Sequence, residues 1–107
     1  MEGNYDIAWD VKASKALRKY HDYYKKNAST SVAERFALAI VEAVETLLEQ
    51  PERYPVDKHL SHLPQQYRAL PVWNFKVVYE FTGFEIIILF IYHTKQSPAR
   101  IRREFEN

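Results

Sequence analysis

Four side chains in the second half of the chain could act together on a phosphodiester: Arg68, Lys76, His93 and Lys95. An arginine and a lysine can stabilise the negative charge that develops on a phosphate during its transfer, and a histidine can give a proton to the leaving oxygen. Such a site needs no metal if a ribose 2′-hydroxyl is the nucleophile. The four residues are therefore candidate catalytic residues for metal-independent cleavage of RNA.

Three of these residues also have explanations that involve no chemistry. His93 follows the apolar run 86–92 and could be only the solvent-facing end of a strand. Lys76 fits a solubilising lysine on an exposed strand face, and Arg68 could form an ion pair across strands with Glu80 or Glu85. A shared catalytic site is therefore a hypothesis, which requires that the strands bring the four side chains together.

Other kinds of site lack the residues that they require. The chain has no cysteine and only two glycines, which excludes a thiol nucleophile, a cysteine zinc site and a glycine-rich phosphate loop. His59 and His62 are three residues apart, but no helical pattern surrounds them and no third metal ligand is evident. We expect neither a metal nor a cofactor. The formal net charge of +1 gives no argument for a nucleic-acid or membrane partner.

The first half of the chain is predicted to form a strand and two helices. Residues 5–9 alternate as in a strand, and Asp10 can cap a helix over residues 11–27. Ser31 and Glu34 have the spacing of a capping box, which predicts the start of a second helix that Pro51 ends. Because only a short segment separates the two helices, we expect an antiparallel helical hairpin.

The second half is predicted to form a loop and three strands. Residues 51–66 contain three prolines and no regular period, whereas 67–70, 73–81 and 85–92 are typical of strands, the last two joined by a turn at Thr82 and Gly83. We predict an α+β fold: an N-terminal strand, a helical hairpin packed on one face of a mostly antiparallel sheet, and a C-terminal three-strand meander. The other face should stay open. Because adjacent strands lie about 4.8 Å apart, we expect the four candidate side chains to converge.

The length fits a single domain over residues 1–107. Residues 99–107 contain three arginines and form a tail that either lies on the open sheet face or is loose. The start of the chain has no signal-peptide pattern, and no apolar run is long enough to cross a membrane. We therefore expect a cytoplasmic protein without a membrane partner.

Three segments resemble motifs of the RelE/ParE superfamily of bacterial type II toxins, which includes plasmid-stabilisation proteins: YRAL at 67–70, FKVVYEF at 75–81 and IIILFIYHTKQSP at 86–98. The resemblance extends over about residues 5–101. It implies a RelE/ParE-like fold and an antitoxin protein that neutralises the toxin, with operator DNA bound only through the antitoxin. It also implies that Arg68 is the strand arginine and His93 the general acid of mRNA-cutting members, whereas Lys76 and Lys95 match less securely.

The superfamily has two branches, and the resemblance leaves both open. RelE-like members enter the ribosome and cut mRNA without a metal, and we predict that this chain is such a ribosome-dependent mRNA endoribonuclease. The alternative is a ParE-like toxin that binds and inhibits DNA gyrase and cuts nothing. In that case the basic helix over residues 11–27 and the C-terminal tail would be docking surfaces.

Overall fold

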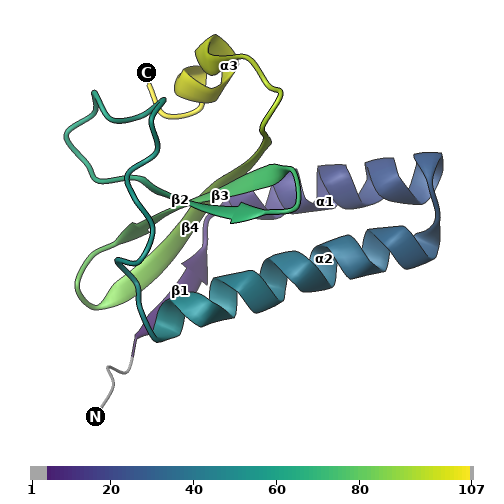
Figure 1. Ribbon diagram of the computed structural model, residues 1–107, viewed down its shortest axis with the longest axis horizontal. Helices are drawn as coiled ribbons and strands as arrows, with labels where there is room; N and C mark the ends of the chain where they lie inside the picture. The colour runs from purple at the N-terminus through teal and green to yellow at the C-terminus, as the bar shows by residue number, and fades with distance from the viewer. Residues whose placement is uncertain (1–4, 107) are drawn as a thin grey trace.

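The structure, a computed structural model, describes residues 5–106, in which a four-stranded sheet carries a helical hairpin (Figure 1). The predicted domain limits at residues 1 and 107 lie outside the described residues. The strand order is β1-β4-β3-β2, with β1 parallel to β4 and the other neighbours antiparallel, which confirms the predicted α+β architecture. The elements are β1 (Asp6–Trp9), α1 (Val11–Asn27), α2 (Thr30–Glu45), the 3₁₀ turn η1 (Thr46–Leu48), β2 (Arg68–Val72), β3 (Phe75–Phe81), β4 (Glu85–His93) and α3 (Pro98–Arg103).

Both helices of the hairpin begin at a side-chain cap. Asp10 caps α1 as predicted, because its carboxylate accepts a hydrogen bond from the Lys12 backbone N–H at 3.0 Å. The cap of α2 is Ser29, whose hydroxyl accepts a hydrogen bond from the Val32 N–H at 3.0 Å. The predicted capping box at Ser31 is therefore wrong. Ser29 has the extended backbone that a cap requires, and Ser31 already lies inside the helix.

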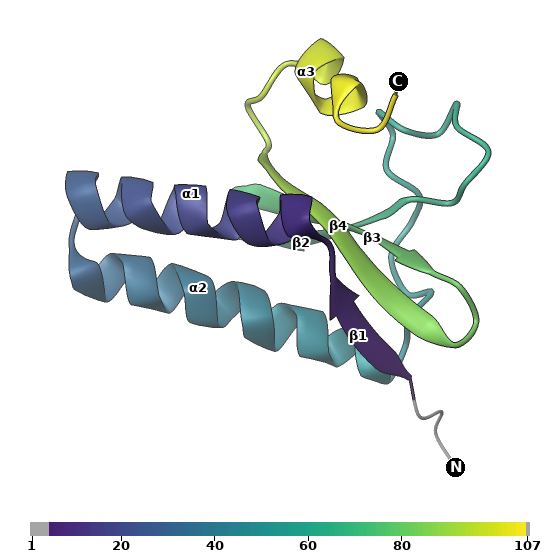
Figure 2. The same cartoon turned by 180° about the vertical axis from the view of Figure 1, so that it is seen from behind.

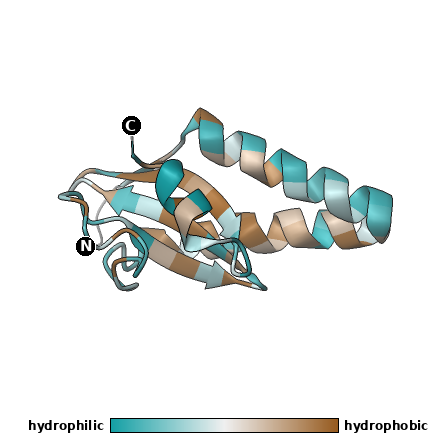
Figure 3. Ribbon diagram, turned by 90° about the horizontal axis from the view of Figure 1, so that it is seen from above, coloured by the Kyte–Doolittle hydropathy of each residue, from teal (hydrophilic) through white to brown (hydrophobic). Residues whose placement is uncertain are grey.

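The hairpin and the sheet enclose a continuous apolar core, which we call the inner core. Tyr79 is fully buried there, and its hydroxyl donates a hydrogen bond to the Pro51 carbonyl at 2.6 Å. Burying side chains of this kind stabilises the fold by about 1.5–3 kcal/mol each. Other members are Ala13, Phe36, Ile40, Leu47, Val77, Ile86, Ile88 and Ile91. Figure 3 shows apolar residues along the strands and along much of α2, whereas α1 is mostly hydrophilic.

The opposite face of the sheet is also covered, contrary to our expectation of an open face. The loop between η1 and β2 and helix α3 lie next to each other on that side (Figures 1 and 2). From them Leu60 and Ile101, both 0% exposed, pack with Val78 and Tyr92 of the sheet. This outer core exists because Val78 and Tyr92 are large apolar residues that a solvated face would leave in water.

A β-bulge in β4 reverses the direction of its last side chains. Val78 lies opposite Phe90 but Tyr79 lies opposite Ile88, which leaves Leu89 as an extra residue. Beyond the bulge, His93 pairs with Phe75 of the inner core. His93 therefore lies on the hairpin face of the sheet.

The turn between β2 and β3 is made by Trp73 and Asn74, so the prediction that Trp73 belongs to a strand is wrong. Trp73 has φ = +53°, a left-handed conformation that costs an L-residue about 1–2 kcal/mol. Pro71 lies within β2 and does not end it. Proline is tolerated there because β2 is an edge strand. The turn at Thr82 and Gly83 is found as predicted.

The residues after β4 lie against the outer core. Phe105 packs on Tyr67, with ring centroids 5.1 Å apart. Glu106 contacts the ring of His62 at 2.5 Å, and the backbone carbonyl of Glu104 accepts a hydrogen bond from the Lys12 ammonium at 2.5 Å. Contacts from three parts of the chain thus hold this segment.

Candidate functional site

The structure does not bring the four predicted catalytic residues to one point. Arg68 lies directly opposite Tyr79 in the β2–β3 register, which places it on the inner face with the hairpin. Lys76 lies opposite Tyr92, on the outer face. His93 is on the inner face, and Lys95 follows it in an exposed turn. Because the sheet separates Arg68 from Lys76, the two cations cannot hold the same phosphate in this arrangement.

The guanidinium of Arg68 is engaged with the loop that precedes β2. It donates hydrogen bonds to the carbonyls of Tyr54 at 2.6 Å and Glu52 at 3.2 Å, and to the side chain of Gln66 at 3.3 Å. The side chain of Arg68 is 17% exposed, and its nearest carboxylate belongs to Glu52, at 3.9 Å. The predicted cross-strand pairs with Glu80 or Glu85 are not found among the ion pairs of the described residues. Arg68 thus holds the loop between η1 and β2 against the sheet through hydrogen bonds.

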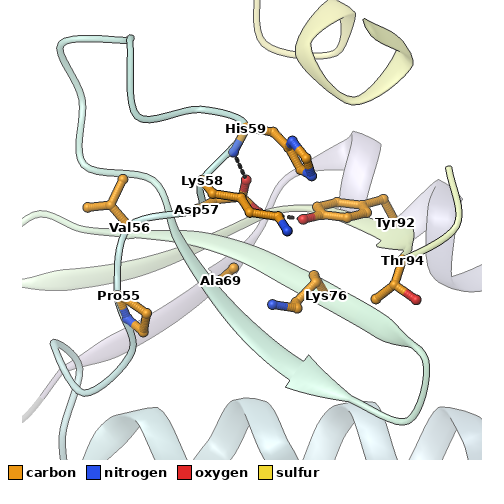
Figure 4. Close-up of a pocket in the computed structure, with 9 residues that line it drawn as sticks. All are labelled: Pro55, Val56, Asp57, Lys58, His59, Ala69, Lys76, Tyr92 and Thr94. Carbon is orange, nitrogen blue, oxygen red and sulfur yellow. Dashed lines mark hydrogen bonds between the residues drawn. The ribbon is translucent and has the colours of Figure 1, made fainter. Parts of the chain in front are cut away.

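Lys76 points into a pocket of about 260 Å³ on the outer face of the sheet (Figure 4). At its centre Asp57, 3% exposed, accepts hydrogen bonds from the His59 backbone N–H at 2.7 Å and from the Tyr92 hydroxyl at 2.5 Å. Burial, followed by the hydrogen bond to Asp57 and its charge, raises the pKa of Tyr92 far above its ordinary value. Within residues 5–106, neither Lys76 nor the neighbouring Lys58 forms an ion pair with a carboxylate.

His93 lines a second cavity, of about 360 Å³, between α1 and the end of β4. Its Nδ1 accepts a hydrogen bond from the Lys95 backbone N–H at 3.1 Å, so in the neutral ring the proton is on Nε2. The ring stands edge-on to Phe75, with centroids 5.0 Å apart. His93 and Lys95 are thus brought together, but by a local turn. The other residues that line the cavity are Lys19, Tyr20, Tyr23, Tyr24 and Phe75.

The residues that define the two cavities carry little signal in the sequence. The sequence predicts a loop without regular structure around Asp57 and an apolar strand that contains Tyr92. A buried aspartate in a proline-rich loop gives no periodic signal, so its tyrosine partner could not be identified. Tyr20 and Tyr24 of α1 pack on the inner core. Tyr23, next to them, is 59% exposed.

No three histidine or acidic side chains within residues 5–106 lie close enough to hold a metal ion. His62, one of the two histidines considered above, contacts Glu106. No helix in the described part of the chain is both long and apolar enough to span a bilayer.

Comparison with known proteins identifies the family. A family model described as the ParE toxin of type II toxin-antitoxin system, parDE, matches residues 7–98. The chain belongs to the ParE toxin family. This ParE-family toxin is similar to a structure of the chromosomal ParDE toxin-antitoxin system from P. aeruginosa, with a TM-score of 0.70 and 26% identity over 83% of this chain and 95% of that chain.

A second solved structure shares the fold of this ParE-family toxin. It is the toxin-antitoxin complex RelBE2 from Mycobacterium tuberculosis, with a TM-score of 0.60 and 19% identity over 85% of this chain and 92% of that chain. A search of curated proteins finds no match. These findings confirm the RelE/ParE resemblance and the fold predicted from it, and the protein is a toxin of the type II toxin-antitoxin class.

Proposed function

We propose that this toxin arrests bacterial growth by binding and inhibiting DNA gyrase, without cutting RNA. The match to the ParE family over residues 7–98 supports this function, which is the alternative that the sequence leaves open. The similarity to a chromosomal ParDE system supports it as well. The main sequence-based prediction, ribosome-dependent cleavage of mRNA, has less support.

The observation that carries the proposal is the separation of Arg68 from Lys76. Acid-base and electrostatic catalysis on a phosphodiester requires groups within about 3 Å of the same phosphate. Arg68 is on the hairpin face and already donates to the carbonyls of Tyr54 and Glu52, whereas Lys76 is on the outer face. A toxin that acts by binding needs no such convergence.

The proposal includes a cognate antitoxin as the second partner. Both structures similar to this chain come from toxin-antitoxin systems, one ParDE and one RelBE2. The antitoxin would cover and neutralise the toxin, and any contact with operator DNA would be made by the antitoxin. Because gyrase and the antitoxin are bacterial cytoplasmic proteins, we place the action of the toxin in the cytoplasm.

Cleavage of mRNA is the second candidate, because the outer-face pocket contains cations without a carboxylate partner. Lys58 and Lys76 could bind a phosphate there. In this version Lys76 is the only predicted catalytic residue at the site. Arg68, His93 and Lys95 would take no part.

The experiment compares two reactions of the purified toxin. The first is supercoiling of relaxed plasmid DNA by gyrase, and the second is cleavage of mRNA in the A site of programmed ribosomes. We expect inhibition of supercoiling that the cognate antitoxin reverses, and no cleavage. The proposal would be contradicted if the wild-type toxin cleaves mRNA and leaves supercoiling unaffected, and if Lys76→Ala or His93→Ala abolishes that cleavage.

A further inference from the structure

Three aromatic side chains form an exposed surface where the second half of α1 meets the β2–β3 turn. Tyr23 is 59% exposed and Trp73 is 49% exposed. Tyr24 lies between them, with its ring centroid 5.8 Å from that of Tyr23 and 5.9 Å from that of Trp73. We call Tyr23, Tyr24 and Trp73 the aromatic surface. It is continuous although its members come from two elements far apart in the sequence.

The aromatic surface borders the cavity that contains His93. Tyr23 and Tyr24 belong to both, and Phe75, only 2% exposed, contributes to the cavity from the inner core. The aromatic surface and the cavity are therefore adjacent. A partner could insert a side chain into the cavity while its neighbouring residues contact the aromatic surface. The volume of the cavity, about 360 Å³, leaves room for such an anchor.

The charge around the cavity is positive or neutral. Lys19 supplies the positive charge among its six lining residues, none of which is a carboxylate. The nearest acidic residue in the sequence, Asp22, lies 3.7 Å from His21 and lines a different hollow with it. A partner segment with carboxylates beside its apolar anchor is therefore complementary to this site.

The surface is held in place before any partner binds. The Trp73 ring packs on Phe36, with centroids 5.6 Å apart, and Phe36 is fully buried. The Asn74 carbonyl in the same turn accepts a hydrogen bond from the Thr94 N–H at 2.9 Å. Trp73 thus stays half-exposed in a left-handed conformation. A rigid tryptophan and two tyrosines lose little conformational entropy on binding, which is why such residues dominate interface energies.

The ring geometry favours a protein partner over a nucleic acid. The planes of Tyr23 and Tyr24 meet at 72°, and those of Tyr24 and Trp73 at 76°. Successive bases of a single strand stack on ring faces along a cationic groove. Neighbouring rings that stand nearly perpendicular to each other offer no such path, and one lysine lines the cavity.

We propose that the aromatic surface and the adjacent cavity are the contact by which this toxin grips its target protein, through an apolar or aromatic side chain flanked by carboxylates. This inference rests on the proposed function in one respect, the identity of the target as gyrase. The chemistry of the contact does not depend on that identity.

The test uses two variants of the surface and a matched control. Tyr23→Ala removes one ring. Trp73→Gly removes another and introduces glycine, which adopts a positive φ without strain. Phe84→Ala removes an 83% exposed aromatic ring from the turn at the opposite end of β3. Circular dichroism and urea unfolding of each purified variant establish that it is folded.

Growth arrest on induction and inhibition of supercoiling by the purified toxin are then measured. We expect Tyr23→Ala and Trp73→Gly to lower inhibition at least tenfold and to relieve growth arrest, with Phe84→Ala equal to wild type. Folded variants as toxic as wild type would overturn the inference. So would variants that lose binding to the antitoxin but keep toxicity, because the surface would then belong to the antitoxin.

A failure of the proposed function gives a different result. If wild-type toxin arrests growth but does not inhibit gyrase, the gyrase proposal fails. The proposal about the aromatic surface is then tested by the growth arrest of the variants alone. Relief by both surface variants but not by Phe84→Ala would support it. A photo-crosslinking residue at position 23 separates the partner classes: a crosslink to gyrase supports both proposals, and a crosslink to RNA overturns the protein contact.

Discussion

The hydroxyl of Tyr92 donates a hydrogen bond to the carboxylate of Asp57 across 2.5 Å, and both residues are 3% exposed. The bond joins β4 to the loop between η1 and β2, which together with α3 covers the outer face of the sheet. The same carboxylate accepts the His59 N–H at 2.7 Å, so it also shapes the loop. One buried aspartate therefore connects the loop to the sheet.

Removing the Tyr92 hydroxyl should destabilise the protein. In Tyr92→Phe the ring remains but the buried carboxylate of Asp57 loses a donor, and a hydrogen bond to a charged group contributes about 1.5–3 kcal/mol. We expect the free energy of unfolding to fall by about 2 kcal/mol in urea titrations. Tyr67→Phe is the control, because the hydroxyl of Tyr67 makes no hydrogen bond within the described residues. A change below about 0.5 kcal/mol for Tyr92→Phe would show that water replaces the hydroxyl.

Alkaline pH should lower the stability of the folded protein. Burial raises the pKa of Tyr92, Tyr79 and Tyr20 above the ordinary value of 10.0. Above pH 10 the unfolded chain releases these protons while the folded chain retains them, so the free energy of unfolding falls as pH rises. Each retained proton contributes a slope of up to about 1.4 kcal/mol per pH unit. Urea unfolding between pH 9 and 11 should show this fall, and a shallower one in Tyr92→Phe.

The elements of this fold could be predicted because local signals determine them. Asp10 caps α1, the apolar period of α2 continues through Ile40 and Val44, and Gly83 makes the turn between β3 and β4. Each of these signals lies within a few residues of the feature that it produces. No local pattern indicates the parallel pairing of β1 with β4, which joins strands from the two ends of the chain.

The arrangement of the candidate site could not be predicted, because it depends on one extra residue. Strict alternation along β4 would place Ile88 and His93 on opposite faces, but the bulge at Leu89 puts both on the hairpin face. Nothing in the run of apolar residues around Leu89 marks the bulge. The covering of the outer face is equally non-local, since Leu60 and Ile101 reach Val78 from segments without regular pattern.

Arg68 should affect stability through the loop that it holds. Arg68→Ala leaves the carbonyls of Tyr54 and Glu52 without their donor, and we expect a loss of about 2 kcal/mol in the free energy of unfolding. Arg68→Lys should restore only part of this loss, because an ammonium cannot reproduce the planar arrangement of guanidinium donors. Urea unfolding measures both. A toxin with Arg68→Ala that unfolds like wild type but has lost all toxicity would instead indicate a direct role in function.

Trp73 should separate backbone strain from side-chain packing. Its φ of +53° is unfavourable for any L-residue with a Cβ atom, whereas glycine adopts it freely. Trp73→Ala keeps the strain and loses the contacts with Tyr24 and Phe36, while Trp73→Gly loses the same contacts and relieves the strain. We expect Trp73→Gly to be more stable than Trp73→Ala by about 1 kcal/mol in urea unfolding. Equal stability of the two variants would mean that the turn relaxes to a negative φ once the indole ring is removed. In that case the packing of Trp73 on Phe36, and not the backbone of the β2–β3 turn, imposes the left-handed conformation.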